Sequence, residues 1–218
     1  MSSNHNRCIS TEKENHYFKT TYDVKGRFSS YWHQINEIVK VRPTKVLEIG
    51  TGTGFVTRYL RERGVDIINI DIVHSLKPNI AASVLAIPFS NEIFSIVACY
   101  EVLEHLPYEE FTTALKELAR VSRKYVVISL PDVTTTYRLF LEFPKIKPIE
   151  KFIPHPSHRS PVHVYDGHHH WEIGKKYYSL KKIKTDIKKT GLKIIKNYRV
   201  FEFPYHRFFV LQKPKSIE

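Results

Sequence analysis

The sequence predicts an α/β fold, a mostly parallel sheet with helices on both faces that ends in an antiparallel hairpin. Short apolar segments alternate with amphipathic ones from residue 44 to residue 131, and such alternation places helices between parallel strands. A glycine-rich turn joins the first apolar segment, residues 46–49, to a helical pattern. Near the end, the apolar runs 192–201 and 205–212 can pair around Pro204. These three observations together indicate the fold class.

Each element follows from its local pattern. Helices are expected where apolar residues recur every three or four positions, as at Tyr31, Ile35 and Ile38. They span about 17–40, 55–63, 108–121 and 179–190. Apolar runs without polar alternation are expected to be strands that are covered on both faces. They lie at about 46–49, 66–71, 83–89, 93–102 and 125–130.

The length and composition fit one domain. A single α/β unit is expected over 16–218 of the 218 residues, with a flexible tail at 1–15 and an irregular substrate-side insertion at about 133–175. No apolar run reaches the roughly 18 residues of a membrane span, and no signal-peptide pattern is present. Cys8 and Cys99 define neither a disulfide framework nor a metal site, and Cys99 is expected to be buried. We therefore expect a cytoplasmic protein.

The net charge of +12 is unevenly distributed. Residues 145–218 contain 17 Lys or Arg and 6 Asp or Glu, whereas residues 1–144 contain 17 and 16. A basic segment of this kind suits an anionic small molecule, nucleic acid or an acidic membrane surface, and it also occurs as a solvated lysine-rich surface. The charge alone leaves the partner open.

The most specific pattern is the turn after the first predicted strand. Gly50, Gly52 and Gly54 alternate with threonines, and Asp71 ends the next apolar run. Glycines let the backbone turn tightly and approach a ligand, and a carboxylate at the end of the second strand can accept hydrogen bonds from a ribose. A dinucleotide fingerprint would need glycine where Phe55 stands, and no Gly-Lys-Ser/Thr sequence follows as in a P-loop. The pattern thus predicts a nucleoside site of another type.

With Glu48, the turn reads E-x-G-x-G-x-G, and here the chain resembles the class I S-adenosylmethionine-dependent methyltransferases. The resemblance continues in A-I-P-F followed by F-S-I-V, in E-V-L-E-H-L from residue 101, and in I-S-L-P from residue 128. These motifs cover about residues 44–132 in the family's order and spacing. The resemblance implies a Rossmann-like, seven-stranded sheet, the cofactor S-adenosylmethionine, and a quinone-biosynthesis-type or other small-molecule branch of the family.

The resemblance also implies a set of cofactor-binding residues on the glycine turn and at the ends of later strands. They are Glu48, Gly50, Thr51, Gly52, Gly54, Asp71, Ile72, Ala86, Ile87, Tyr100 and Glu101. The glycine turn would surround the methionine moiety, and Asp71 would hold the ribose. Ile72 would cover one face of adenine, while Tyr100 and Glu101 would border the sulfonium centre.

Two positions depart from the family's pattern. Ser83 stands where many members have an acid that binds the adenine amino group, so backbone groups near Ala86 and Ile87 are expected to make these contacts. Ser95 replaces the usual aspartate of the F-D-x-V segment, a change expected to affect local capping. Before the first helix, the segment containing Tyr17 is expected to fold over the cofactor, as in similar enzymes.

Methyl transfer depends on alignment of the nucleophile with the methyl group, and it needs a general base only where the nucleophile holds its proton tightly. The candidates for catalysis are His105 in the E-V-L-E-H-L segment, and His169 and His170 in the insertion. His105 suits a structural role equally well. Adjacent histidines cannot all point at one ion and the zinc spacings are absent, so no metal is predicted. The histidine-rich loop either covers the active-site mouth or is an aromatic-anchored surface loop.

The sequence therefore predicts an enzyme that transfers a methyl group to a small molecule. One alternative is an RNA- or protein-directed methyltransferase that uses the basic last third. The Asn/Asp-Pro-Pro-Tyr tetrapeptide of amino-methylating nucleic-acid enzymes is absent, which argues against adenine-N6 transfer. The other alternative is a nucleoside-binding domain without catalysis.

Overall fold

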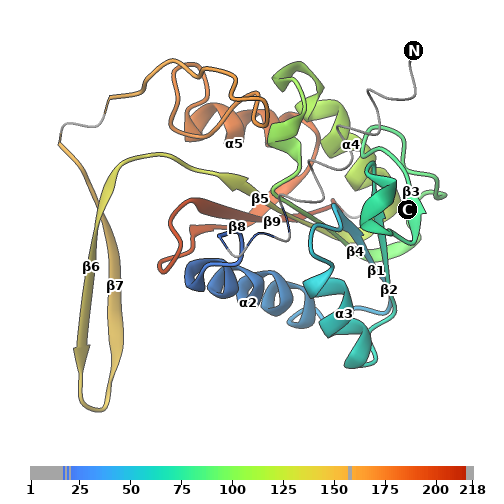
Figure 1. The fold of residues 1–218 in the computed structure, drawn as a ribbon, viewed down its shortest axis with the longest axis horizontal. Helices are drawn as coiled ribbons and strands as arrows, with labels where there is room; N and C mark the ends of the chain where they lie inside the picture. The colour runs from blue at the N-terminus through green and yellow to red at the C-terminus, as the bar shows by residue number, and fades with distance from the viewer. Residues whose placement is uncertain (1–16, 18, 20, 157–158, 215–218) are drawn as a thin grey trace.

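The computed structural model describes residues 17, 19, 21–156 and 159–214; the expected tail at 1–15, with Cys8, lies outside the described residues. A seven-stranded sheet in the described part has the order β3-β2-β1-β4-β5-β9-β8 (Figure 1). Its strands are β1 Val46–Ile49, β2 Ile67–Asp71, β3 Ile80–Ala81, β4 Phe94–Tyr100, β5 Ser122–Pro131, β8 Lys193–Arg199 and β9 His206–Gln212. The first five pair in parallel, and β9 runs antiparallel to β5 and β8. The predicted fold class is confirmed.

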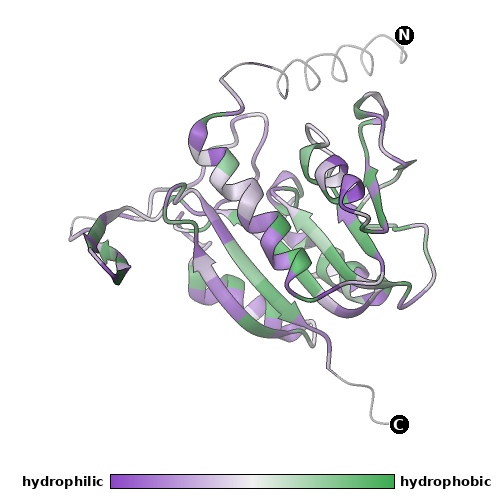
Figure 2. Cartoon of the chain, turned by 90° about the horizontal axis from the view of Figure 1, so that it is seen from below, coloured by the Kyte–Doolittle hydropathy of each residue, from purple (hydrophilic) through white to green (hydrophobic). Residues whose placement is uncertain are grey.

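Helices cover both faces of this sheet (Figure 1). On one face lie α2 Lys25–Val39 and α3 Phe55–Glu62; on the other lie α4 Phe111–Val121 and α5 Leu180–Lys189. Successive strand residues point to opposite faces, so Val97 packs in the core under α4 and α5 while its neighbours Ile96 and Ala98 pack in the core under α2 and α3. Both faces of the sheet are buried, which explains why most residues of β4 are apolar; Figure 2 shows hydrophobic segments along the strands of the sheet.

The predicted position of the third strand was wrong. The sheet uses Ile80–Ala81, which pairs with the end of β2, and the predicted segment 83–89 forms turns. Side chains form hydrogen bonds with the backbone groups of this segment. The Ser83 hydroxyl accepts from the backbone N–H of Leu85, and the carbonyl of Ile87 accepts from Arg120 of α4. With those groups occupied, the segment cannot extend the ladder.

The insertion also differs from the irregular stretch that was expected. Two strands, β6 Thr136–Phe143 and β7 Ile146–Pro154, form a separate antiparallel hairpin that projects from the body of the molecule (Figure 1). Lys145 has φ 64° at its tip, which closes the turn. The prolines of this segment concealed the strands in the sequence, yet proline is tolerated where a strand has a free edge.

The hairpin carries exposed apolar side chains along both strands. They include Tyr137, Leu139, Phe140, Leu141, Phe143, Ile146, Ile149 and Ile153. Its base is held to the body by Arg138, which donates to the carbonyl of Phe201, and by Phe152, whose ring lies 5.4 Å from that of Phe201. None of the helices among the described residues has the length and apolar character needed to cross a bilayer. Cys99 is fully buried, as expected.

Candidate functional site

The glycine turn connects β1 to α3 in a conformation that only glycine adopts easily. Gly50, Gly52 and Gly54 have φ angles of 87°, 49° and 69°. A Cβ on Gly50 would lie 2.5 Å from Cγ2 of Val102, so the turn packs directly against the segment that leaves β4. The turn and the β4 end therefore form one continuous surface.

Two buried carboxylates support this turn. The Glu48 carboxylate accepts the hydroxyl proton of Thr57, and burial raises the pKa of Glu48 to about 7. Asp71, at the end of β2, accepts the backbone N–H of Thr51 at 2.7 Å and that of Val73 at 2.8 Å. Asp71 thus ties the glycine turn to the neighbouring strand, and each of its oxygens keeps a lone pair for another donor.

A narrow pocket of about 70 Å³ lies between the turn, α2 and the β4 end. Its lining comprises Tyr17, Tyr22, Arg27, Tyr31, Gln34, Glu48, Gly50, Thr51, Gly52, Thr53, Phe55, Val56, Tyr100, Glu101 and Val102. The Arg27 guanidinium lies 3.9 Å from the ring centroid of Tyr22, and the rings of Tyr17 and Tyr22 are in edge contact. These three side chains cover the glycine turn, at the place where the sequence predicts a covering segment.

Six of the eleven predicted cofactor residues line this pocket, namely Glu48, Gly50, Thr51, Gly52, Tyr100 and Glu101. The other five lie around it. Gly54 is the N-cap of α3, Asp71 stands behind the turn, and the Ile72 side chain is 72% exposed. Ala86 is exposed, and the side chain of Ile87 is part of the core. The roles of all eleven residues stay predictions.

A larger cavity of about 730 Å³ lies elsewhere, between the hairpin base and the surface of α2 and β8. Trp32, Phe152 and Tyr198 are among its lining residues, and it contains no residue of the glycine turn. Its size alone would favour this cavity as the ligand-binding site. The smaller pocket is the better candidate because the strained turn and the buried acids converge there.

Beyond β4, the chain places two acids in the interior. Glu101 has a positive φ of 52°. Its Oε2 lies 3.6 Å from Nε2 of His206. Burial lowers the pKa of His206 to about 3. Burial raises the pKa of Glu101 to about 7. Glu104 is fully buried, and burial together with the nearby Glu101 raises its pKa well above the usual range. Within the part of the chain that the structure describes, Oε1 of Glu101 and both carboxylate oxygens of Glu104 have no hydrogen-bond partner.

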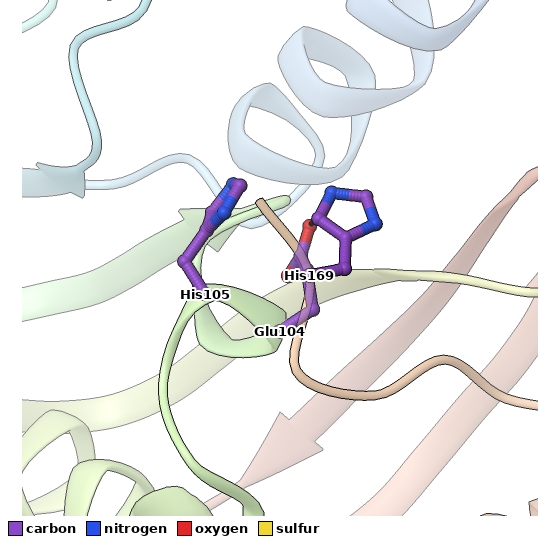
Figure 3. A group of neighbouring side chains, drawn as sticks. All are labelled: Glu104, His105 and His169. Atoms are coloured by element: carbon purple, nitrogen blue, oxygen red, sulfur yellow. Dashed lines mark ion pairs between the residues drawn. The ribbon is translucent and has the colours of Figure 1, made fainter. Parts of the chain in front are cut away.

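The histidine-rich loop brings His169 beside this segment (Figure 3). The rings of His105 and His169 are 4.9 Å apart, and Nε2 of His169 lies 4.0 Å from Oε1 of Glu104. His170 is placed differently: its backbone N–H donates to the carbonyl of Glu104, while its ring lies against Tyr165. The structure therefore gathers His105 and His169 at one point and leaves the His170 ring outside it.

The same loop is anchored by Trp171. This side chain is fully buried against Tyr108 and Phe111, and its Nε1 donates to the carbonyl of Leu106 at 3.1 Å. Of the two expected arrangements, an aromatic anchor is therefore present. Trp171 fixes the loop to the core, and His169 lies at the edge of the site.

Sequence reasoning missed a supporting pair. Tyr205 donates its hydroxyl to Oε1 of Glu172 at 2.6 Å, and Nδ1 of His169 lies 3.1 Å from the same oxygen. No local pattern marks Tyr205, because it reaches the loop only after β9 has joined the sheet. Glu104 could have been found from the sequence, because it belongs to the E-V-L-E-H-L segment that resembles the family motif.

Comparison with known proteins identifies the fold and the family of the chain. No curated protein sequence matches the chain. In the solved structures, the whole fold is similar to a 1,6-didemethyltoxoflavin N1-methyltransferase from Burkholderia thailandensis with S-adenosylhomocysteine bound, at 12% identity and a TM-score of 0.61, covering 99% of this chain and 91% of that one. It is also similar to magnesium protoporphyrin IX methyltransferase from Synechocystis PCC 6803 with S-adenosylmethionine bound, at 15% identity and a TM-score of 0.57, covering 87% and 80%.

A third similar structure is an S-adenosylmethionine-dependent methyltransferase from Clostridium acetobutylicum, at 10% identity and a TM-score of 0.60, covering 95% of this chain and 100% of that one. At these identities, structural likeness establishes the fold. The sequence itself matches the family model described as a methyltransferase domain over residues 24–197, which is most of the chain. The chain therefore belongs to the family of methyltransferase domains.

Proposed function

We propose that the chain transfers a methyl group from S-adenosylmethionine to a small-molecule acceptor. The pocket where the glycine turn meets the end of β4 carries this proposal. In it, the Thr51 hydroxyl and Oε1 of Glu101 are buried, and no residue that the structure describes forms a hydrogen bond with them. Such atoms are costly unless a ligand satisfies them, and an amino-acid moiety with an ammonium group offers suitable donors.

The residues of the pocket divide the work of binding. Gly50, Thr51 and Gly52 present backbone to the methionine moiety, and Asp71 directs its remaining lone pairs to the ribose. Glu101 lies at the sulfonium side, where a carboxylate in a low-dielectric pocket attracts a cation strongly. When bound, the cofactor supplies an activated methyl carbon. The protein then has to align the acceptor with this carbon and exclude water.

The side chains that cover the glycine turn control the access of the cofactor to the pocket. A pocket of about 70 Å³ is smaller than the roughly 300 Å³ at which ligand sites begin. Tyr17 and Tyr22 must therefore move away from the turn to admit a nucleoside, and their return would shield the methyl group from water. The acceptor would approach from the side of His105 and His169, and the position of the His170 ring does not favour a role in catalysis.

A small acceptor is supported by two of the similar proteins, which are named as methyltransferases of 1,6-didemethyltoxoflavin and of magnesium protoporphyrin IX. An anionic acceptor gains less support. Lys182 and Lys189 of α5 share the carboxylate of Asp186, and Lys196 of β8 pairs with Glu37, so most of this positive charge is balanced away from the pocket. Nothing in the described pocket favours an RNA- or protein-directed enzyme.

Cofactor affinity tests the proposal. The Asp71→Ala variant should bind S-adenosylhomocysteine roughly 10- to 100-fold more weakly, because it loses charge-assisted hydrogen bonds of about 1.5–3 kcal/mol to the ribose and to the turn. Isothermal titration calorimetry measures this. Asp66→Ala is the matched control, since it removes an exposed acid just before the other end of β2. Equal affinities in wild type and Asp71→Ala would refute the ribose role, and a wild type that binds no S-adenosylhomocysteine would refute the function.

A further inference from the structure

We propose that Glu104, His105 and His169 bind a divalent metal ion at the acceptor side of the pocket. One potential ligand atom from each residue lies within 4.8 Å of the others (Figure 3). Glu104 and His105 end the short 3-10 helix Leu103–His105 that follows β4, and His169 comes from the loop anchored by Trp171. Two distant segments therefore converge on one point.

The buried carboxylate is the first observation that points to a cation. The Glu104 side chain is fully buried, and neither of its oxygens has a hydrogen-bond partner among the described residues. A buried acid without a partner carries a large desolvation cost, which a coordinated cation offsets. Nε2 of His169 stands 4.0 Å from Oε1 of Glu104, too far for a hydrogen bond. Ligand atoms that each lie about 2.0–2.2 Å from one ion stand at most about 4.4 Å apart, so this pair is within reach of a single ion.

The hydrogen bonds of the two imidazoles are the second observation. Nδ1 of His105 lies 2.8 Å from the carbonyl oxygen of His168, and Nδ1 of His169 lies 3.1 Å from Oε1 of Glu172. Both oxygens can only accept, so each Nδ1 carries a proton and donates, which leaves Nε2 as the ligand atom of each ring. Histidine ligands of metals are oriented in this way, with the other nitrogen donating to a carbonyl or a carboxylate. The Tyr205 hydroxyl holds Glu172 in place by donating to the same oxygen at 2.6 Å.

The ligand chemistry indicates the class of metal. Two imidazoles and one carboxylate suit borderline divalent ions such as Mn²⁺, Fe²⁺, Co²⁺ or Zn²⁺. Three protein ligands leave coordination positions open, as in catalytic sites. The consecutive histidines at 168–170 argued against a metal in the sequence because neighbouring rings diverge. The structure needs only His169 from that run, and the remaining ligands come from the 3-10 helix.

An ion at this position would define the acceptor, and this step rests on the proposed methyl transfer. An acceptor hydroxyl in an open position on the ion would have a lowered pKa, and its proton would pass to water. The oxygen then forms a bond to the methyl carbon as the bond from that carbon to sulfur breaks. The sulfur keeps the electron pair, which gives neutral S-adenosylhomocysteine. We therefore infer a hydroxyl-bearing acceptor and O-methylation.

Titration of the untagged, metal-free protein with Mn²⁺ tests the site by calorimetry, without any acceptor. We expect about one ion per chain, and at least roughly 10-fold weaker binding in Glu104→Gln and in His169→Asn. His168→Asn is the matched control, because it removes an adjacent exposed ring and keeps the backbone carbonyl that His105 contacts. Unchanged Mn²⁺ affinity in Glu104→Gln and His169→Asn would overturn the proposal.

A second measurement does not depend on the variants folding. Pulsed electron paramagnetic resonance of the wild-type Mn²⁺ complex should detect coupling to imidazole nitrogen. Absence of that coupling, or a wild-type Kd weaker than about 1 mM, would also overturn the metal site. S-adenosylhomocysteine binding, measured in parallel, separates the two proposals: if it persists without a metal, only the metal site fails.

Discussion

The Trp171→Ala variant should unfold with a free energy about 3–5 kcal/mol lower than that of the wild type. Its indole is fully buried and meets the rings of Tyr108 and Phe111 edge to face, with ring centroids 5.0 and 5.1 Å away. Truncation leaves a cavity in the core under α4 and α5, and it also leaves the carbonyl of Leu106 without its Nε1 donor. Urea denaturation followed by circular dichroism measures the loss.

Trp32 provides the matched control for Trp171. It is the other tryptophan of the chain, and it is 60% exposed on α2. Trp32→Ala should change the free energy of unfolding by less than about 0.5 kcal/mol. Trp171→Phe keeps most of the ring packing and should cost much less than alanine. Similar losses in Trp171→Ala and Trp32→Ala would show that the histidine-rich loop is not anchored in the core.

The Gly50→Ala variant should lose about 2–5 kcal/mol of unfolding free energy together with its cofactor affinity. About 1–2 kcal/mol follows from placing a Cβ at φ 87°, and about 1–3 kcal/mol follows from its 2.5 Å approach to Cγ2 of Val102. Relief of the clash would push the turn away from the β4 end, and this movement would disturb the pocket. Chemical denaturation and S-adenosylhomocysteine calorimetry measure the two effects.

Two further variants separate these causes. Gly64 also has a positive φ, 78°, but an added Cβ there meets nothing within 4 Å, so Gly64→Ala should cost only the backbone strain. Combining Gly50→Ala with Val102→Ala removes the clashing methyl groups, and a double-mutant cycle should then show a favourable coupling of about 1–3 kcal/mol. Additive effects of Gly50→Ala and Val102→Ala would contradict the close packing of the turn on the β4 end.

The parts of the fold that the sequence predicted are those encoded by local patterns. The run from β1 through Gly50, Gly52 and Gly54 to Asp71 combines an apolar strand, a turn that needs glycine and a terminal acid, and each is visible within a few residues. Ser179, which caps α5 by accepting from the backbone N–H of Lys182, is another local signal. The positions of these elements agree with the prediction within a few residues at each end.

The parts that were missed depend on long-range contacts. β3 is two residues long, and its place is set by pairing with the end of β2. In β7, the prolines outweighed the strand pattern, although they stand in a two-stranded hairpin whose edges are free. In the site, Tyr205 contacts Glu172 only because β9 brings it beside the insertion. No local sequence pattern predicts that contact.

The order of the sheet has a consequence for the timing of folding. β9 is the last strand in the chain, yet it lies between β5 and β8 and pairs with β5 from Tyr125 to Pro131. Every strand of the parallel half, with the glycine turn and Asp71, precedes the end of β5. During synthesis, the nascent chain can therefore complete the nucleoside half first while β5 still has an open, apolar edge.

At about 5–20 residues per second, the ribosome needs roughly 4–15 s to advance from the end of β5 to β9. An unpaired apolar strand edge is a template for association with other chains during that time. Tyr205, which immediately precedes β9, joins the molecule only when this interval ends. The proposed acceptor side is therefore the last part of the site to form, and its assembly coincides with the pairing of the open edge of β5 with β9.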